Sequence, residues 1–189
     1  MNFTQDWFTH NVPNFAECMA TIPEKNLFLE IGVFEGRSTC WLLQNGLADK
    51  GSIVCVDTFA GGQSHDGVDF KAVEARFWSN TNEAKKSEQK VSLYKKRSYS
   101  ALAEMIGHKY VFDFMYIDGS HTAYDTMSDA CMAWGMLKSG GVMLFDDYEW
   151  NKYPELVRNP KLGIDAFLGV YAGQYELMFK GYQLAVKKL

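Results

Sequence analysis

Short apolar runs alternate with longer stretches of mixed apolar and polar residues along most of the chain. The run at residues 27–31 is almost continuously apolar and is broken by Gly32, as expected for a strand that is buried on both faces. Similar runs predict strands at residues 27–31, 52–56, 90–96, 110–117, 142–145, 175–180 and 182–187. The intervening stretches predict helices at residues 14–21, 36–45, 69–80, 98–107, 122–137 and 154–168.

The order of these elements predicts the fold class. Five alternations of strand and helix are followed by two strands that only Gly181 separates, which is typical of a terminal antiparallel hairpin. We therefore expect an α/β protein with a Rossmann-like, doubly wound, mostly parallel seven-stranded sheet and a C-terminal antiparallel hairpin. At 189 residues, and without an internal repeat or linker, the chain is expected to form a single domain over residues 1–189.

Composition and charge narrow the classes of function. Apolar residues make up 47% of the chain and charged residues 22%, which are the values of a globular protein and not of a disordered one. The formal net charge of -4 gives no general attraction for nucleic acid. We interpret the basic clusters at residues 85–86 and 95–97 as solvated faces.

The cysteines and the first residues indicate the compartment. The chain has no C-x-x-C pair among its cysteines, which are Cys18, Cys40, Cys55 and Cys131. Cys40 falls inside a predicted helix and Cys55 inside a predicted strand, which favours a role as small buried hydrophobic residues over disulfides or zinc ligands. No apolar segment reaches the ~18 residues of a membrane-spanning helix, and the start of the chain lacks the features of a signal peptide. We expect a cytoplasmic protein without a membrane partner.

The loop after the first strand has the pattern E-x-G-x-x-x-G, from Glu30 through Gly32 to Gly36. A tight turn at this place exposes backbone N–H groups at the carboxyl end of a central strand, where open α/β folds bind nucleotide-like ligands. A dinucleotide-binding motif requires a second glycine where Val33 stands, and a P-loop requires a lysine where Arg37 stands. The pattern fits neither motif, and a plain strand-turn-helix connection is the alternative interpretation.

An acidic residue and a long loop follow the second strand. Asp57 lies 21 positions after Gly36, about where an acid accepts hydrogen bonds from ribose hydroxyl groups, and its alternative role is a turn or helix cap. The loop at residues 58–67 is longer than a simple connection requires, and such loops are often functional. Gln63, His65 and Asp66 could contact a cofactor or a substrate there, although a solvated loop histidine is an equal alternative.

Acidic residues recur where the predicted strands end. Glu30, Asp57, Asp118 and Asp146 each stand at the carboxyl end of a strand, and Asp147 follows directly. Parallel order brings these ends to one edge of the sheet, where unrelieved repulsion between like charges would be destabilising. A positively charged group is therefore expected at this edge, either a sulfonium cofactor or a divalent metal ion.

Three segments together resemble a known family. LEIGVFEGRST, the strand ending VDTF and YIDGSHTAYDTMSDACMAWGMLKSGGVMLFDDY are similar to the small class I S-adenosylmethionine-dependent methyltransferases related to macrocin-type sugar O-methyltransferases, and more distantly to catechol-type enzymes. The resemblance covers residues 26–148. It implies that S-adenosylmethionine is bound by Glu30, Gly32, Gly36, Asp57, Thr58, Phe59, Ser98 and Asp118. It also implies a magnesium ion held by Asp118, Asp146 and Asp147.

The chemistry of methyl transfer agrees with this resemblance. The enzyme must align the acceptor oxygen, the methyl group and the sulfur atom, and it must remove the proton of the hydroxyl group. Magnesium can lower the pKa of that hydroxyl. His121, three residues after Asp118, is the expected base, and both residues are expected to be catalytic. The alternative for His121 is a helix N-terminal residue bonded to a backbone carbonyl.

The sequence thus predicts an O-methyltransferase that acts, with the assistance of magnesium, on a hydroxyl group of a sugar or another small polar molecule. Tyr148 and Trp150, just past the acidic pair, could line a substrate pocket or simply pack against the sheet. A homo-oligomer is possible, since a partner subunit or the amino-terminal segment could bind the acceptor. Three alternatives stay open, namely a metal-independent methyltransferase, a nucleotide-binding module without catalytic activity and a hydroxylase-like relative on the same scaffold.

Overall fold

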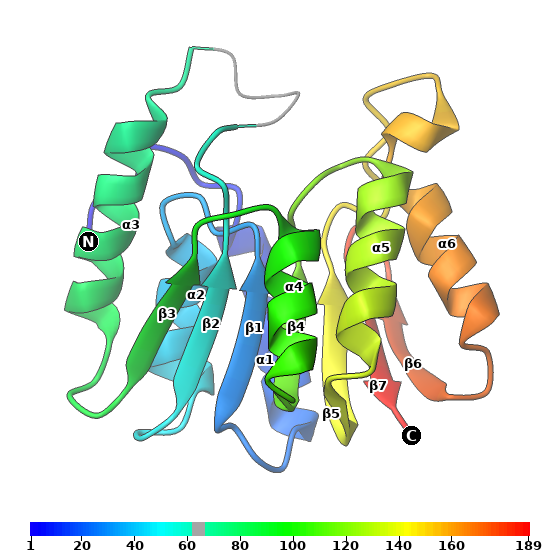
Figure 1. Cartoon of the computed structure of the whole chain (residues 1–189), viewed down its shortest axis with the longest axis horizontal. Coiled ribbons are helices and arrows are strands. Elements are labelled where there is room, and N and C mark those ends of the chain that lie inside the picture. The colour runs from blue at the N-terminus through cyan, green and yellow to red at the C-terminus, as the bar shows by residue number, and fades with distance from the viewer. Residues whose placement is uncertain (62–66) are drawn as a thin grey trace.

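The computed structural model describes residues 1–61 and 67–189, and its centre is a seven-stranded sheet with the strand order β3-β2-β1-β4-β5-β7-β6 (Figure 1). The pairs from β3 through β5 are parallel, and β7 pairs antiparallel with both β5 and β6. The strands are β1 (Leu27–Ile31), β2 (Ser52–Val56), β3 (Lys90–Tyr94), β4 (Phe112–Ile117), β5 (Leu137–Phe145), β6 (Tyr175–Lys180) and β7 (Leu184–Lys188). The predicted fold class is confirmed.

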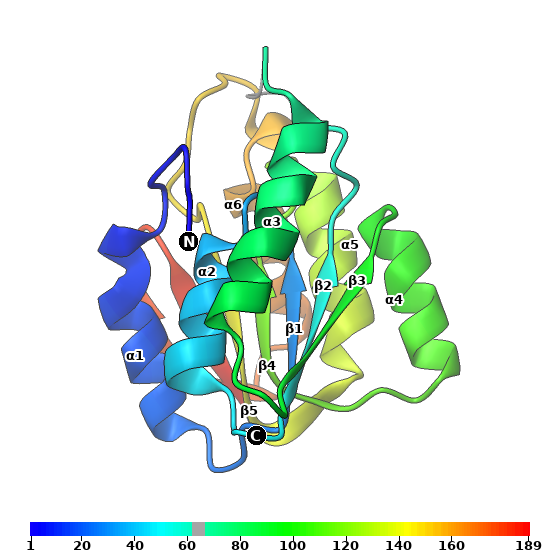
Figure 2. The same ribbon diagram turned by 90° about the vertical axis from the view of Figure 1, so that its left-hand side faces the viewer.

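Helices cover both faces of this sheet. The α-helices are α1 (Val12–Thr21), α2 (Arg37–Trp41), α3 (Phe70–Ala84), α4 (Ser98–Gly107), α5 (Ala123–Trp134) and α6 (Lys161–Val170). Three short turns complete the described elements, namely η1 (Thr9–Asn11), η2 (Leu42–Gly46) and η3 (Leu156–Arg158). Figure 2 shows α1, α2 and α3 on one side of the sheet and α4 and α5 on the other. Among the described residues, no helix has the length and apolar character needed to cross a membrane.

Alternate residues of the central strands supply two separate cores. Phe28 of β1 and Phe114 of β4 point into the core beneath α1, α2 and α3, whereas Leu29 and Met115, their neighbours in sequence, point into the core beneath α4, α5 and α6. All four side chains are buried. Both faces of β1 and β4 are therefore covered by apolar side chains, which is why these strands read as continuous apolar runs.

Several predicted element bounds are wrong. The helix expected over residues 69–80 continues to Ala84, because Thr81 and Ala84 face the core, and Asp69 accepts backbone hydrogen bonds as its cap. The helix expected over residues 122–137 ends at Trp134, and β5 starts at Leu137 and runs through the two glycines expected to form a turn.

The helix expected to begin at Pro154 begins instead at Lys161. The residue before it, Pro160, is the N-cap of α6, and only the short turn η3 forms within the preceding segment. Ser98, the expected cap of α4, is the first residue of that helix, and the N-cap residue is Arg97.

The carboxyl ends of β1 and β4 lie in close contact. The amide of Asp118 donates a hydrogen bond of 2.8 Å to the carbonyl of Ile31, and the amide of Gly32 donates one of 2.8 Å to the carbonyl of Val56. A Cβ atom at Gly32 would lie 1.9 Å from the carbonyl oxygen of Asp118, and Gly32 has φ +83°. Glycine is thus required where the three strands β2, β1 and β4 present their ends together.

Candidate active site

Glu30 lies in β1 directly beneath the start of α2. The hydroxyl group of Ser38 donates a hydrogen bond to one carboxylate oxygen, and the hydroxyl group of Thr39 donates to the other at 2.6 Å. The side chain is fully buried, and this burial raises the pKa of Glu30 to about 7. Glu30 is therefore engaged inside the protein, where it fixes the helix that follows the glycine loop.

The glycine loop itself is held by Asp57. One carboxylate oxygen accepts hydrogen bonds from the amides of Val33 at 2.9 Å and Phe34 at 3.1 Å, and the other accepts one from the amide of Phe59 at 2.8 Å. Phe34 has φ +47° and Phe59 has φ +46°, so both turns pass through a backbone conformation that is unfavourable for a side chain with a Cβ atom. Asp57 thus fills its alternative role as a turn cap, and its predicted ribose role stays a prediction.

The remaining predicted cofactor residues lie around the same edge. Gly36 is the N-cap of α2 with φ +80°, and Thr58 accepts a hydrogen bond of 3.2 Å from the amide of Ala60. Ser98, at the start of α4, hydrogen-bonds the carboxylate of Asp129, and burial raises the pKa of Asp129 to about 7. Gln63, His65 and Asp66 lie outside the described residues.

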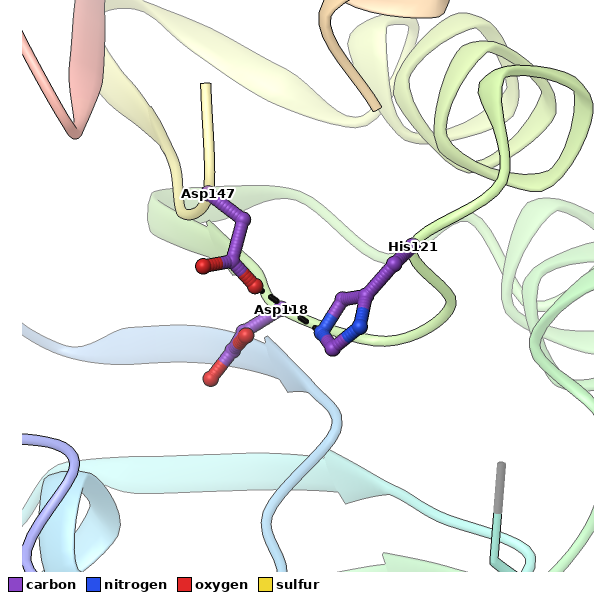
Figure 3. Close-up of side chains that lie close together, drawn as sticks. All are labelled: Asp118, His121 and Asp147. Carbon is purple, nitrogen blue, oxygen red and sulfur yellow. Dashed lines mark ion pairs between the residues drawn. The ribbon is translucent and has the colours of Figure 1, made fainter. Parts of the chain in front are cut away.

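Asp118, His121 and Asp147 come together at the ends of β4 and β5. The Nε2 atom of His121 lies 2.8 Å from Oδ2 of Asp147, and one ligand atom from each of the three residues lies within 4.8 Å of the other two. Figure 3 shows the side chains of Asp118 and His121, which come from one loop, facing Asp147 from the next. The structure therefore brings the two predicted catalytic residues together with one of the predicted metal ligands.

Electrostatics make this cluster unfavourable in the absence of a cation. Burial raises the pKa of Asp118 well above its usual range, and repulsion from Asp146 and Asp147 raises it further. For Asp147, burial works in the opposite direction to the hydrogen bond from His121, and the net effect is a lowered pKa. The carboxylates of Asp118, Asp146 and Asp147 thus repel one another, and the single histidine beside them can offset only part of their negative charge.

Asp146 points into the protein. Its Oδ2 atom accepts hydrogen bonds from the hydroxyl group of Tyr116 at 2.5 Å and from the side chain of Asn11 at 3.4 Å. Its Oδ1 atom accepts hydrogen bonds from the amide of Asp147 at 2.9 Å and from the side chain of Gln183 at 3.1 Å. Both oxygen atoms of Asp146 are therefore engaged by hydrogen bonds within the protein. The predicted metal ligands were Asp118, Asp146 and Asp147, but the residues whose ligand atoms converge are Asp118, His121 and Asp147.

Sequence reasoning missed the residues that hold Asp147. The hydroxyl group of Tyr182, in the turn between β6 and β7, donates a hydrogen bond of 2.7 Å to Oδ1 of Asp147. The ring of His10 lies 6.3 Å from the ring of Tyr182, and the charge of this histidine also lowers the pKa of Asp147. Asp147 itself has φ +58°. Neither partner belongs to a local motif, since both come from chain segments remote from the acidic pair.

Trp150 covers one side of the candidate base. Its ring centroid lies 4.6 Å from that of His121, with an angle of 48° between the ring planes. Tyr148 is buried, and its hydroxyl group donates a hydrogen bond of 2.8 Å to Asp165 of α6. Tyr148 therefore packs into the fold, and it also lines one cavity together with Trp150, so the predicted pocket role is compatible with both residues.

The donor set of this cluster fits a divalent cation. Asp118 and Asp147 offer the carboxylate oxygens that magnesium prefers, and magnesium keeps part of its water shell, so two carboxylates are enough protein ligands. A cation there would relieve the repulsion that raises the pKa of Asp118. Asp118 and Asp147 could thus hold the ion. Asp146 would orient Asp147, because its carboxylate accepts a hydrogen bond from the backbone amide of Asp147.

Comparisons with known proteins agree with the fold. A family model described as a methyltransferase domain matches residues 29–148. A probable caffeoyl-CoA O-methyltransferase 1 from Dictyostelium discoideum is 25% identical over 121 residues, which are 63% of this chain and 46% of that protein. The chain thus spans about half the length of this curated relative.

Two solved structures show the likeness of the fold. The O-methyltransferase from Bacillus cereus in complex with SAH superposes with a TM-score of 0.70 at 20% identity, covering 98% of this chain and 84% of that chain. CalS11, a TDP-rhamnose 3'-O-methyltransferase of calicheamicin biosynthesis, superposes with a TM-score of 0.60 at 15% identity, covering 95% of this chain and 80% of that chain.

Proposed function

The chain belongs to the methyltransferase domain family, and from that premise we propose that it is an S-adenosylmethionine-dependent O-methyltransferase, assisted by magnesium, that methylates a hydroxyl group of a sugar or another small polar molecule. The observation that carries the proposal is the convergence of Asp118, His121 and Asp147 beside the glycine loop. Relatives support the cofactor and the acceptor class, since one solved neighbour contains SAH and another is named for a sugar acceptor.

The cofactor would bind across the ends of β1 and β2. Gly32 and Gly36 let the loop pack closely against Asp118 and against α3, and Asp57 holds the amides of Val33 and Phe34 in place. Asp57 is half-buried, so its carboxylate could also accept ribose hydroxyl groups. Glu30 would act indirectly by fixing the start of α2, and Ser98 would lie near the adenine.

Proton removal would depend on His121. Its Nε2 atom is held by Asp147, and Asp147 is held in turn by the hydroxyl group of Tyr182. This arrangement orients the imidazole ring so that it can accept the proton of a bound hydroxyl group as the methyl group is transferred. When bound, magnesium would hold that hydroxyl group and lower its pKa. Asp118 would help to bind both the metal and the acceptor.

A metal-independent transfer is the second candidate. The contact of 2.8 Å between His121 and Asp147 forms a histidine-carboxylate pair that could remove the proton without a metal ion. The two candidates differ in one respect only, because chelation of magnesium would abolish turnover in the first and leave it unchanged in the second.

The first experiment is calorimetric titration of S-adenosylhomocysteine into the protein, with magnesium and again with a chelator. We expect micromolar binding in both conditions, since the cofactor residues and the metal residues are largely distinct. Absence of binding in both would contradict the methyltransferase proposal.

The second experiment tests the base with the variant His121→Gln. If His121 accepts the proton, turnover of a hydroxyl acceptor should fall by about 10²–10⁴-fold, while the affinity for S-adenosylhomocysteine changes less than about threefold. The matched control is His108→Gln, at the C-terminal end of α4, which should keep full turnover. Equal turnover of His121→Gln and the unmodified protein would exclude the base role.

We place this activity in the cytoplasm, in agreement with free thiols at Cys18 and Cys55.

A further inference from the structure

A cavity of about 430 Å³ adjoins the candidate base on the side of α6. Trp150 lines this cavity and also contacts the ring of His121, so the cavity and the candidate active site share the side chain of Trp150 as a wall. Its volume lies within the range of about 300–1,000 Å³ that is usual for small-molecule sites. The cavity is bounded by the segment after Asp147 and by the first turns of α6.

The walls of the cavity are ordered by contacts within the protein. The side chain of Asn159 donates hydrogen bonds to the carbonyls of Tyr153 at 2.7 Å and Glu155 at 3.2 Å, and it accepts one from the amide of Tyr153 at 3.3 Å. On the other wall, a Cβ atom at Gly163 would lie 2.1 Å from the carbonyl oxygen of Ala123, so α6 packs backbone to backbone on α5. The cavity is therefore preformed.

Most polar groups of the lining are already paired. Asp165 accepts hydrogen bonds from the hydroxyl group of Tyr148 and from the amino group of Lys161. The amide donors of Asn159 are used within its own segment. Glu149 and Asn151, which are exposed at the cavity, complete its polar lining, and a polar ligand that bound elsewhere in it would have to break existing hydrogen bonds.

Apolar side chains, by contrast, are exposed at the cavity. Leu156 is 70% exposed and Leu162 is 44% exposed, and both line the cavity together with Trp150. Covering such side chains is favourable in proportion to the apolar area removed from water. A flat ring could in addition pack against the indole of Trp150.

We propose that this cavity binds the apolar body of the methyl acceptor, an aromatic ring or an apolar group of similar size, while the hydroxyl group of the same molecule reacts at His121. This inference rests on the proposed function and refines its acceptor, which is then amphiphilic and not polar throughout. Leu156, Leu162 and Trp150 are the residues that select it.

The test is a binding measurement that needs no turnover. Phenol and myo-inositol, two probes of similar ring size, are titrated into protein that carries ¹³C-labelled leucine methyl groups. Phenol should shift the methyl resonances of Leu156 and Leu162 in a saturable manner, and inositol should leave them unchanged. Unchanged resonances with phenol, or equal shifts with both probes, would overturn the proposal.

Variants locate the binding. Leu162→Asn and Leu156→Asn should each weaken phenol binding at least about fivefold, because each replaces apolar contact area with a polar group. The control Val170→Asn lies at the opposite end of α6, is 65% exposed and does not line the cavity, so its phenol affinity should match that of the unmodified protein. Phenol affinity that survives both leucine substitutions would refute the assignment of the site.

Calorimetry with S-adenosylhomocysteine on the same samples separates the two proposals. Cofactor binding without phenol binding would remove only the acceptor inference. Phenol binding without cofactor binding would remove the proposed methyl transfer and show the cavity to be an independent aromatic site, which contradicts its role for an acceptor.

Discussion

At the scale of single residues, Gly32 decides whether the ends of β1 and β4 can meet. The carbonyl oxygen of Asp118 occupies the space that a Cβ atom at Gly32 would need, at a distance of only 1.9 Å. Asp118 belongs to the candidate metal cluster, so this backbone contact also sets the distance between the glycine loop and the candidate catalytic residues. The glycine therefore serves both the stability of the sheet edge and the geometry of the site.

We expect Gly32→Ala to lower the free energy of unfolding by about 3–5 kcal/mol, which combines the positive φ with a displacement of the end of β4. The matched control is Gly140→Ala, since Gly140 has φ +78° and no heavy atom lies within 4 Å of the place that its Cβ atom would take. Its loss should be about 1–2 kcal/mol from backbone strain alone. Chemical denaturation measures both, and equal losses would show that the contact with Asp118 is easily relieved.

At the scale of elements, the hydrogen-bonded pair of Ser98 and the buried Asp129 joins the start of α4 to the middle of α5. The N-cap residue of α4 makes no side-chain hydrogen bond to the first turn of that helix. Asp129 is buried and lies close to the strand end, because one of its carboxylate oxygens would be 3.6 Å from a Cβ atom at Gly119. The carboxylate thus fixes two helices at the edge where the cofactor is proposed to bind.

This pair makes stability depend on pH. Burial raises the pKa of Asp129 from 3.8 to about 7, so between these values the folded state holds a proton that the unfolded state has released. The contribution of Asp129 to the free energy of unfolding therefore falls as pH rises from about 4 to about 7, and it stays constant above that.

The variant Asp129→Asn carries no titrating group at this position, so it should gain stability relative to the unmodified protein as pH rises. We expect the difference between the two free energies of unfolding to change in favour of the variant by about 1–3 kcal/mol between about pH 5 and pH 8. Urea denaturation at both pH values measures this difference, in which other titrating groups such as Glu30 cancel. A difference that is the same at both pH values would mean that Asp129 ionises normally in the folded protein.

The elements also show how far the sequence alone can be used. The bounds of β1 and β2 were predicted correctly because both strands are buried on two faces and end at Gly32 and Asp57. The start of α6 was predicted at Pro154 and lies at Lys161, because residues 154–160 are held by side-chain hydrogen bonds of Asn159 and carry no helical periodicity. Local sequence patterns predict elements in which buried apolar residues recur at a regular spacing. They miss segments whose conformation is fixed by a few side-chain hydrogen bonds.

At the scale of the whole molecule, the candidate site is assembled from segments far apart in the chain. Asp118 and His121 were predicted from one loop, but two further partners of the acidic pair come from opposite ends of the sequence. Asn11 contacts Asp146 from η1, and Tyr182 contacts Asp147 from the hairpin. No spacing rule connects such residues, so the convergence of the candidate catalytic groups was predictable and the residues that support them were not.

The amino-terminal segment reaches the other end of the site as well, through the buried carboxylate of Glu35. The backbone amide and the hydroxyl group of Thr4 donate hydrogen bonds of 2.6 and 2.7 Å to its two oxygen atoms, and Arg76 of α3 forms an ion pair with it. Glu35 precedes Gly36 in the glycine loop and is only 1% exposed. One carboxylate therefore ties the loop to the first residues of the chain and to α3.

The substitution Glu35→Gln should disrupt this junction, because every partner of the carboxylate is a donor and the new amide group would face one of them with a second donor. We expect the free energy of unfolding to fall by about 3 kcal/mol, as for a buried ion pair that loses one partner. The matched control Glu88→Gln breaks an exposed ion pair with Lys50 and should lower it by less than about 1 kcal/mol. The affinity for S-adenosylhomocysteine, measured by calorimetry where both variants are folded, should fall at least about tenfold for Glu35→Gln and stay unchanged for Glu88→Gln. An unchanged affinity for Glu35→Gln would mean that the shape of the loop is set by Asp57 and Gly32 alone, without the amino-terminal segment.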